Sequence, residues 1–338
     1  MQRVKTMNPR AYSQRLGTLT PEQLQAALNC FELGTLTDAQ PISAGMFGQN
    51  LFVSSDQGDW VLRGCPHTDW QFPAERFFTG LIRERSSLPV AHPYLYEPSS
   101  HIFGWPFVLT PRMPGLQLEA DDTYAALGEA DKTGVALALA RTLAEFQEIT
   151  WDCAGRYDLE LQSVRPLDTD YRAWLVGRTR ELLANSLAAS DNTKTSDAIW
   201  VESVLRASET ALAEPYAVTL VHEDYKLGNL HLEQASDGVW RVCGLFDLMT
   251  LHFGDGEADL ARQLGWYLRK DPPRATVFAN EYIRLKRPSA GFARRQQVYM
   301  LYDCLIIWEF FQRWVSGMPE QPSCLREWAG PLVGFWAE

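Results

Sequence analysis

The chain has 338 residues, of which 46% are hydrophobic and 22% are charged, and its formal net charge is −11. That length predicts two domains, or one domain with two lobes, in an ordinary globular protein. The acidic balance argues against a nucleic-acid partner, because phosphate backbones select basic surfaces. No apolar run approaches the ~18 residues of a membrane span, and the six cysteines form no C-x-x-C pair. We therefore expect a cytoplasmic protein without a disulfide framework, a zinc site or a membrane partner.

The first 114 residues indicate a small β-rich lobe that follows a short arm. Residues 1–19 carry four basic side chains and no acidic one, a pattern that suits an N-terminal arm and also occurs in organellar transit peptides. Thr20, with a proline directly after it, predicts the start of a helix that runs to about Phe31. The β-type runs that follow are Thr35–Ile42, Leu51–Ser54, Trp60–Arg63, Tyr94–Glu97 and Phe107–Met113.

Two features of this lobe suit phosphate binding. The turn after the first β run contains Gly45 and Gly48, and glycine lets backbone N–H groups approach phosphate oxygens, although such a turn can also be a simple flexible tip. The third β run ends at Arg63, and the next predicted helix, Phe72–Arg85, places Glu75 on a partly apolar face. Because a carboxylate there is costly to bury without a cation, we expect Glu75 to pair with Arg63.

Residues 115–338 indicate a larger, mainly helical lobe. Apolar residues recur with helical spacing between Thr133 and Ile149. Further helices are predicted at about Asp168–Ala188, Asp197–Ala213, Ala258–Leu268, Thr276–Leu285, Arg294–Ser316 and Cys324–Trp328. The chain therefore belongs to the α+β class, with prolines 111 and 114 marking the passage between the lobes.

The stretch on which the larger lobe is centred is VHEDYKLGNL, residues 221–230. Its His222, Asp224, Lys226 and Asn229 have the spacing H-x-D-x-K-x-x-N. This spacing matches the catalytic loop of kinases, in which the Asp takes the proton of the substrate hydroxyl and the Asn holds a metal ion. Eight residues form a weak signal alone, so the remaining parts of such a site have to be present elsewhere in the chain.

A predicted hairpin directly after this stretch supplies one such part. Two strand-like segments, Leu230–Glu233 and Trp240–Phe246, flank a Ser-Asp-Gly turn. Folding at that turn brings Asn229 opposite Phe246 or Asp247. Amide and carboxylate oxygens placed side by side are suitable ligands for Mg²⁺, which takes its other ligands from water and phosphates.

Taken in this order, the motifs resemble those of the aminoglycoside phosphotransferase/choline kinase group, the small-molecule branch of the protein-kinase-like fold. The resemblance covers about residues 35–268. It rests on SAGMFGQN, on WVLR with Glu75, on HEDYKLGN, and on LFDLMTLHFGDGEADLA, the last through Asp247, Gly254, Asp255, Asp259, Leu260 and Ala261. It implies a bilobal fold with an N-terminal arm (1–19), an antiparallel-sheet N-lobe (20–114) and a helical C-lobe (115–338).

The resemblance also implies an activity, the Mg²⁺-dependent transfer of a phosphoryl group from ATP or GTP to a hydroxyl of a small molecule. That acceptor would be an antibiotic, such as an aminoglycoside or a macrolide, or a metabolite. In the C-lobe, Asp224 would be the base, Lys226 would neutralise the transferring group, His222 would support the loop, and Asn229 and Asp247 would hold the metal. In the N-lobe the nucleotide would be bound by Arg63, Glu75, Gly45, Gly48, Thr110 and Met113.

The chain departs from the expected pattern at three positions. Asp247 is followed by Leu-Met rather than Phe-Gly, Glu223 stands where this branch usually has glycine, and Arg63 replaces the lysine of protein kinases. Arg63 and the altered glycine loop leave a non-catalytic nucleotide-binding protein on a kinase-like fold as the alternative. A hydrolase finds no support, because the sequence lacks a G-x-S-x-G or H-E-x-x-H motif.

The sequence leaves the acceptor open. An acidic segment, residues 119–131, would suit a cationic acceptor or form a solvated loop, whereas the aromatic C-terminal helices would suit an apolar acceptor.

Overall fold

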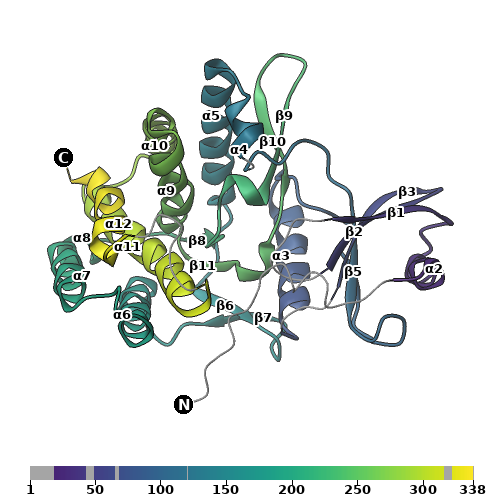
Figure 1. The fold of residues 1–338 in the computed structure, drawn as a ribbon, viewed down its shortest axis with the longest axis horizontal. Coiled ribbons are helices and arrows are strands. Elements are labelled where there is room, and N and C mark those ends of the chain that lie inside the picture. Colours follow the sequence, from purple (N-terminus) through teal and green to yellow (C-terminus); the bar gives the residue numbers. More distant parts are fainter. Residues whose placement is uncertain (1–18, 43–48, 65–67, 120, 316–321, 338) are drawn as a thin grey trace.

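The computed structural model describes residues 19–42, 49–64, 68–119, 121–315 and 322–337. Gly45 and Gly48 therefore lie outside the described residues, as does almost all of the predicted arm. The chain forms two lobes of unequal size, with a helix, α3 (Gln71–Arg85), standing between them (Figure 1).

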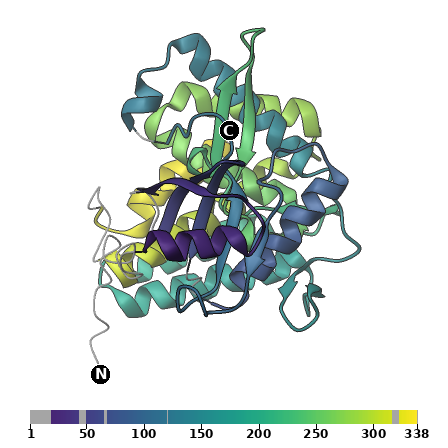
Figure 2. The same cartoon turned by 90° about the vertical axis from the view of Figure 1, so that its right-hand side faces the viewer.

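The N-lobe is a five-stranded antiparallel sheet with one helix across a face (Figure 2). The strands β1 (Leu36–Ile42), β2 (Gln49–Ser55), β3 (Gly58–Gly64), β4 (Leu95–Glu97) and β5 (Phe107–Pro111) lie in the order β1-β2-β3-β5-β4. Helix α2 (Pro21–Asn29) begins as predicted, because the Thr20 hydroxyl accepts from the N–H of Gln23 and the Gln23 side chain accepts from the N–H of Thr20. The core between helix and sheet contains Leu24, Leu28, Leu51, Val53, Leu62, Phe107 and Leu109.

Helix α3 connects the two lobes through its two ends. Phe72, in its first turn, packs with Tyr94 and Val108 of the N-lobe. Phe78 and Ile82, further along, belong instead to the large C-lobe core. Because α3 also packs against the short helix η2 (Leu248–Thr250), which directly follows Asp247, it places Glu75 close to that segment of the C-lobe.

The C-lobe is mainly helical, as the sequence predicts. Its α-helices are α4 (Asp121–Ala125), α5 (Glu129–Phe146), α6 (Tyr171–Ala189), α7 (Thr195–Ala207), α8 (Glu209–Leu212), α9 (Leu260–Lys270), α10 (Pro272–Lys286), α11 (Phe292–Phe310) and α12 (Leu325–Val333). Helix α11 continues as a π-helical turn, η4 (Phe311–Val315). None of the helices that the structure describes is long and apolar enough to cross a membrane; a cytoplasmic location stays a prediction.

A second sheet in the C-lobe was only partly predicted. Strand β8 (Val218–Val221) was expected, whereas its partners β11 (His252–Asp255), β6 (Gly155–Asp158) and β7 (Ser163–Pro166) were not; the order is β7-β6-β11-β8. These strands have four residues each, which is too short to leave a periodic signal in the sequence, and β11 pairs with β6 and β8 across long stretches of chain. Their pairing matters for function, because β8 leads into His222 and β11 follows Asp247, and Val221 lies opposite His252.

The hairpin after the central stretch forms as predicted. Strands β9 (Leu230–Gln234) and β10 (Trp240–Leu245) pair antiparallel, and the N–H of Phe246 donates to the carbonyl of Asn229 at 3.0 Å. Two independent pairings, β9 with β10 and β8 with β11, therefore fix the two predicted motif segments next to each other.

Candidate active site

The loop of residues 222–229 joins β8 to β9 and is held by the start of α9. The buried carboxylate of Asp259 accepts from the backbone N–H groups of His222 and Glu223, at 2.6 and 2.8 Å. One helical turn later, the side chain of Gln263 accepts from the N–H of Leu227 at 2.8 Å. The sequence identified Asp259 only as part of a pattern, and Gln263 not at all. Both fix the backbone of the loop and thereby its side chains.

His222 connects this loop to the segment that carries Asp247. The imidazole is fully buried, and its Nε2 lies 3.0 Å from the carbonyl oxygen of Phe246. Because a carbonyl oxygen can only accept, Nε2 carries a proton. Burial lowers the pKa of His222 below its ordinary value, so the ring is neutral near pH 7. Its contacts are those of a supporting residue.

Asp224 lies among cations. Its Oδ2 accepts from Nδ2 of Asn229 at 2.9 Å and lies 3.2 Å from Nζ of Lys226. Its Oδ1 lies 3.3 Å from a guanidinium nitrogen of Arg262, which Asp303 of α11 in turn pairs at 2.6 Å. Burial alone would raise the pKa of Asp224, but Arg262 and Lys226 outweigh it and hold the pKa below its usual value. Asp224 is therefore an ionised carboxylate in a fixed orientation.

Asp247 has different surroundings, although it belongs to the same site. Its backbone is left-handed, with φ of 60°, a conformation that is uncommon for residues other than glycine. Burial raises the pKa of Asp247 to about 6 despite the nearby cation of Arg63, and the carboxylates of Glu75 and Asp224 act in the same direction. Among the described residues, none donates a hydrogen bond to this carboxylate.

The oxygens of Asn229 and Asp247 fit a magnesium site. The amide nitrogen of Asn229 donates to Asp224, and no described residue donates a hydrogen bond to its Oδ1. The part of the chain that the structure describes contains no group of three or more His, Cys, Asp or Glu side chains that could hold a metal ion by itself. Two hard oxygen donors without protein partners suit Mg²⁺, which keeps waters and takes phosphate oxygens as its remaining ligands.

The N-lobe contributes the predicted ion pair. One guanidinium nitrogen of Arg63 lies 2.7 Å from both carboxylate oxygens of Glu75. Glu75 is buried and also accepts from the hydroxyl of Tyr94 at 2.7 Å, a partner that the sequence did not indicate. The side chain of Arg63 is 26% exposed. Asp247 of the C-lobe is among the groups that raise the pKa of Arg63, so the ion pair lies close enough to that segment to interact with it.

Two other predicted regions are the end of strand β5 and the acidic segment of residues 119–131. Strand β5 ends at Pro111, two residues earlier than expected; Thr110 is buried in it opposite Val61, and Met113 follows it. In the acidic segment, Glu129 pairs with Arg274 at 2.5 Å and Asp131 accepts from the indole of Trp240 at 3.0 Å. These two of the segment's five acidic residues therefore have partners within the fold.

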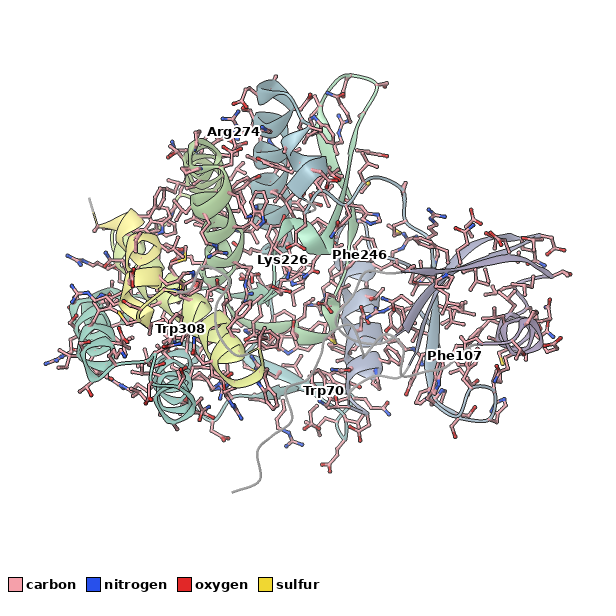
Figure 3. The ribbon with its side chains drawn as sticks, in the orientation of Figure 1. Trp70, Phe107, Lys226, Phe246, Arg274 and Trp308 are labelled. Carbon is pink, nitrogen blue, oxygen red and sulfur yellow. The ribbon has the colours of Figure 1, made fainter. Side chains whose placement is uncertain are left out.

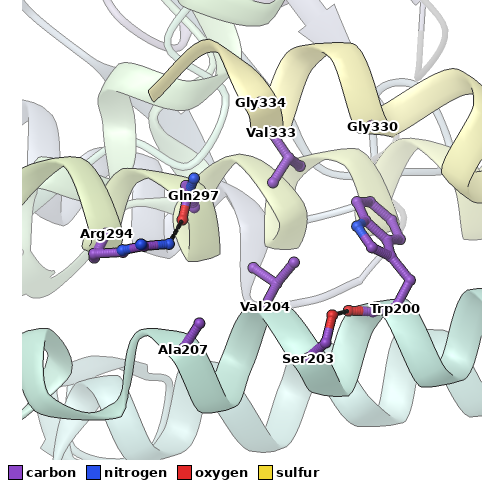
Figure 4. A pocket seen from close by; sticks show the side chains of 9 residues that line it. All are labelled: Trp200, Ser203, Val204, Ala207, Arg294, Gln297, Gly330, Val333 and Gly334. Carbon is purple, nitrogen blue, oxygen red and sulfur yellow. Dashed lines mark hydrogen bonds between the residues drawn. The ribbon is translucent and has the colours of Figure 1, made fainter. Parts of the chain in front are cut away.

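The site lies where the lobes meet. Lys226 and Phe246 lie in the region between the N-lobe sheet and the C-lobe helices (Figure 3). A separate hollow of about 270 Å³ lies between α7, α11 and α12 (Figure 4). Its walls include Trp200, Val204 and Val333 and contain none of the predicted site residues.

This architecture is the bilobal protein-kinase-like fold, as comparison with solved structures shows. A proposed aminoglycoside phosphotransferase from Ralstonia eutropha JMP134 has a TM-score of 0.68 at 15% identity, over 95% of this chain and 98% of its own. A thermostable mutant of aminoglycoside phosphotransferase APH(4)-Ia, in a ternary complex with ADP and hygromycin B, has a TM-score of 0.65 at 17% identity, over 91% and 97%. The GDP and kanamycin complex of APH(2")-IIIa has a TM-score of 0.61 at 15% identity, over 94% and 98%.

The family is established by sequence. The phosphotransferase enzyme family matches residues 38–296, which is more than half of the chain, so the chain belongs to that family. No curated protein matches it in sequence. The matched range contains every residue predicted for the site, from the glycine turn to Asp247.

Proposed function

We propose that this chain is a Mg²⁺-dependent kinase that transfers the γ-phosphoryl group of ATP or GTP to a hydroxyl of a small molecule. One observation carries the proposal. The ionised carboxylate of Asp224, flanked by Lys226 and Arg262, lies in the same site as oxygens of Asn229 and Asp247 that accept no hydrogen bond from a described residue. The cation of Arg63, from the N-lobe, lies close enough to Asp247 to interact with it. These are the parts that phosphoryl transfer requires.

In the proposed reaction, the bond between the γ-phosphorus and the bridging oxygen breaks while the acceptor oxygen bonds to that phosphorus. Asp224 orients the acceptor hydroxyl and takes its proton. Lys226, 3.2 Å from Asp224, neutralises charge on the transferring group. His222 holds the loop through Phe246. Since the transition state is loose, positioning and electrostatics supply most of the rate.

Asn229 and Asp247 are the residues that would hold Mg²⁺, and the ion would supply charge neutralisation at the phosphates. Arg63 would bind the α- and β-phosphates, because Glu75, itself held by Tyr94, contacts one nitrogen of its guanidinium and leaves the other nitrogens for phosphate oxygens. Arginine is well suited to this task, since its planar fork matches phosphate oxygens. Gly45 and Gly48 would cradle the phosphates, and the backbone of Thr110 to Met113 would contact the base.

The ligands of the similar structures support a nucleotide donor and suggest candidates for the acceptor. The similar structures contain ADP with hygromycin B or GDP with kanamycin, so ATP and GTP are both candidate donors and an aminoglycoside is a candidate acceptor. A macrolide or a hydroxylated metabolite is the alternative acceptor, because Glu129 and Asp131 of the acidic segment already have partners. No feature of the site calls for nucleic acid or a membrane.

The test is release of ADP or GDP by the purified full-length chain with Mg²⁺, across a panel of aminoglycosides, macrolides and hydroxylated metabolites. We expect acceptor-dependent release that is lost in Asp224→Asn and kept in Asp237→Asn, a matched change at an exposed hairpin turn. Nucleotide binding in a thermal-shift titration, without transfer to any acceptor and without hydrolysis, would contradict the proposal. That result would instead support the non-catalytic nucleotide-binding alternative.

A further inference from the structure

Glu223, the residue before Asp224, has a conformation that a glutamate rarely adopts. Its φ is 70°, in the left-handed region that favours glycine. Strained positions of this kind persist where the surroundings over-determine them, and they cluster at functional sites. The presence of a glutamate here therefore requires an explanation in terms of what its side chain does.

The side chain is held by two elements that are distant in the sequence. Its Oε1 accepts from Arg156 of β6 at 3.0 Å and from the hydroxyl of Tyr302 of α11 at 2.9 Å. Arg156 in turn lies over the ring of Trp174 of α6, 4.8 Å from its centroid. These contacts fix the carboxylate against a wall formed by an arginine and two aromatic rings.

The second carboxylate oxygen is left available. Both contacts use Oε1, and none of the residues that the structure describes donates a hydrogen bond to Oε2. The side chain is 19% exposed. Burial alone would raise the pKa of Glu223, but Arg156 and His252 outweigh it, so the pKa lies below its usual value and the carboxylate is ionised near pH 7.

Helix α11 connects the side chain of Glu223 to the reaction centre. Tyr302 binds Glu223, while the next residue, Asp303, pairs with Arg262, which contacts Asp224. Two consecutive residues of one helix therefore position two consecutive residues of the loop. Glu223 and the predicted base Asp224 are thus adjacent in the loop, and adjacent residues of α11 hold them.

We propose that Oε2 of Glu223 recognises the acceptor by accepting a hydrogen bond from a second polar group, a hydroxyl or a protonated amine, near the hydroxyl that reacts. This inference rests on the proposed function for the identity of Asp224 as the base. The site would therefore prefer polyols and amino alcohols as acceptors to compounds with a single hydroxyl. It also makes Glu223 a specificity-determining residue of the site.

The test measures binding, so that it does not depend on turnover. The full-length chain is titrated by calorimetry with kanamycin, which carries amines and hydroxyls, with glucose, which carries hydroxyls only, and with cyclohexanol, which carries one. The variants are Glu223→Gly, which suits the observed φ and should fold, and Glu223→Gln. Glu160→Gly, at a position whose side chain is 90% exposed in the β6–β7 turn, is the matched control.

We expect kanamycin or glucose to bind the wild type more tightly than cyclohexanol, and Glu223→Gly to weaken that binding at least about tenfold, as loss of a charge-assisted contact predicts. The dissociation constant for nucleotide should change less than twofold. Glu223→Gln should keep binding if the recognised group is a hydroxyl and lose it if the group is an ammonium. Glu160→Gly should behave as the wild type.

Equal probe affinity in Glu223→Gly and the wild type would overturn the inference, as would a wild type that prefers cyclohexanol or binds no probe. A structural role for Glu223 predicts a lowered melting temperature in Glu223→Gly with probe affinity unchanged. Probe binding that depends on Glu223, in a chain that transfers no phosphoryl group, would leave this inference standing and count against the proposed function.

Discussion

Asp224 and Asp247 are the same residue type in one site, yet their surroundings shift their pKa values in opposite directions. Asp224 contacts Asn229, Lys226 and Arg262, and the cations hold its pKa below the ordinary value. Asp247 receives no hydrogen bond from any described residue, and burial raises its pKa to about 6. The first carboxylate has its charge balanced by the protein, whereas the second does not.

The difference indicates a division of labour. A carboxylate with its cations in place is ready to orient a hydroxyl, and a buried carboxylate that accepts no hydrogen bond from a described residue is ready to receive a metal ion. Pairs of titratable groups whose environments drive their pKa values apart commonly mark separate chemical roles. The following changes test whether these two aspartates have the roles that their neighbours indicate.

The largest effect is expected from Asp224→Ala. Removing the group that takes the proton should lower turnover at least ~100-fold, while binding of the magnesium nucleotide is kept, because Asn229 and Asp247 remain. Steady-state kinetics and a nucleotide titration measure the two quantities separately. Normal turnover in this variant would show that Asp224 is not the base.

Asp247→Asn should act on the metal. Because the amide is a weaker ligand for a hard cation, we expect Mg²⁺ affinity in the presence of nucleotide to fall roughly 10- to 100-fold, the range seen when metal-site partners are changed. Turnover should recover in part at high Mg²⁺. A Mg²⁺ titration of activity measures the shift, and an unchanged Mg²⁺ requirement would place the metal elsewhere.

The pKa of Asp247 predicts a pH dependence. Its raised pKa of about 6 means that the carboxyl is ionised above pH 7 and mostly protonated at pH 5. Protons then compete with the metal, so Mg²⁺ affinity should fall about tenfold between pH 7 and pH 5. Asp224, whose pKa is lowered, stays ionised over this range. The same titration in Asp247→Asn corrects for protonation of the nucleotide and should show a flatter profile.

Arg262→Leu should have a smaller effect through Asp224. The loss of one charge-assisted contact, about 1.5 kcal/mol, corresponds to roughly tenfold in turnover. Arg262→Lys keeps the charge and should recover part of that loss. An effect of Arg262→Leu on nucleotide affinity instead of turnover would contradict a role in positioning Asp224. Arg284→Leu, at a position of α10 whose side chain is 64% exposed, is the control.

The smallest effect is expected from Tyr94→Phe. The hydroxyl donates to Glu75 at 2.7 Å, and its loss should lower the free energy of unfolding by about 1 kcal/mol. Because Arg63 keeps both contacts to Glu75, the nucleotide KM should change little. Denaturant unfolding and nucleotide kinetics measure the two effects, and a large rise in KM would show that Tyr94 is essential to the position of Arg63.

Much of the site was predictable because its parts are local in the sequence. The spacing of the 222–229 loop, the Asp-Gly turn of the hairpin and the cap of α2 each depend on a few neighbouring residues. The pairing of Arg63 with Glu75, across 12 positions, followed from the cost of burying a lone carboxylate. In the fold, long amphipathic helices were predicted, whereas the four-residue strands β6, β7 and β11 were not.

The sequence alone thus determined which residues could carry the chemistry and the order in which the chain presents them. Only the tertiary structure decided their electrostatic state and their support. Arg262 and Asp303 reach Asp224 from α9 and α11, Asp259 holds the loop backbone, and Tyr94 completes the partners of Glu75. The physical reason is that a pKa and an orientation depend on burial and on neighbours in space, and neither is encoded in the spacing of a motif.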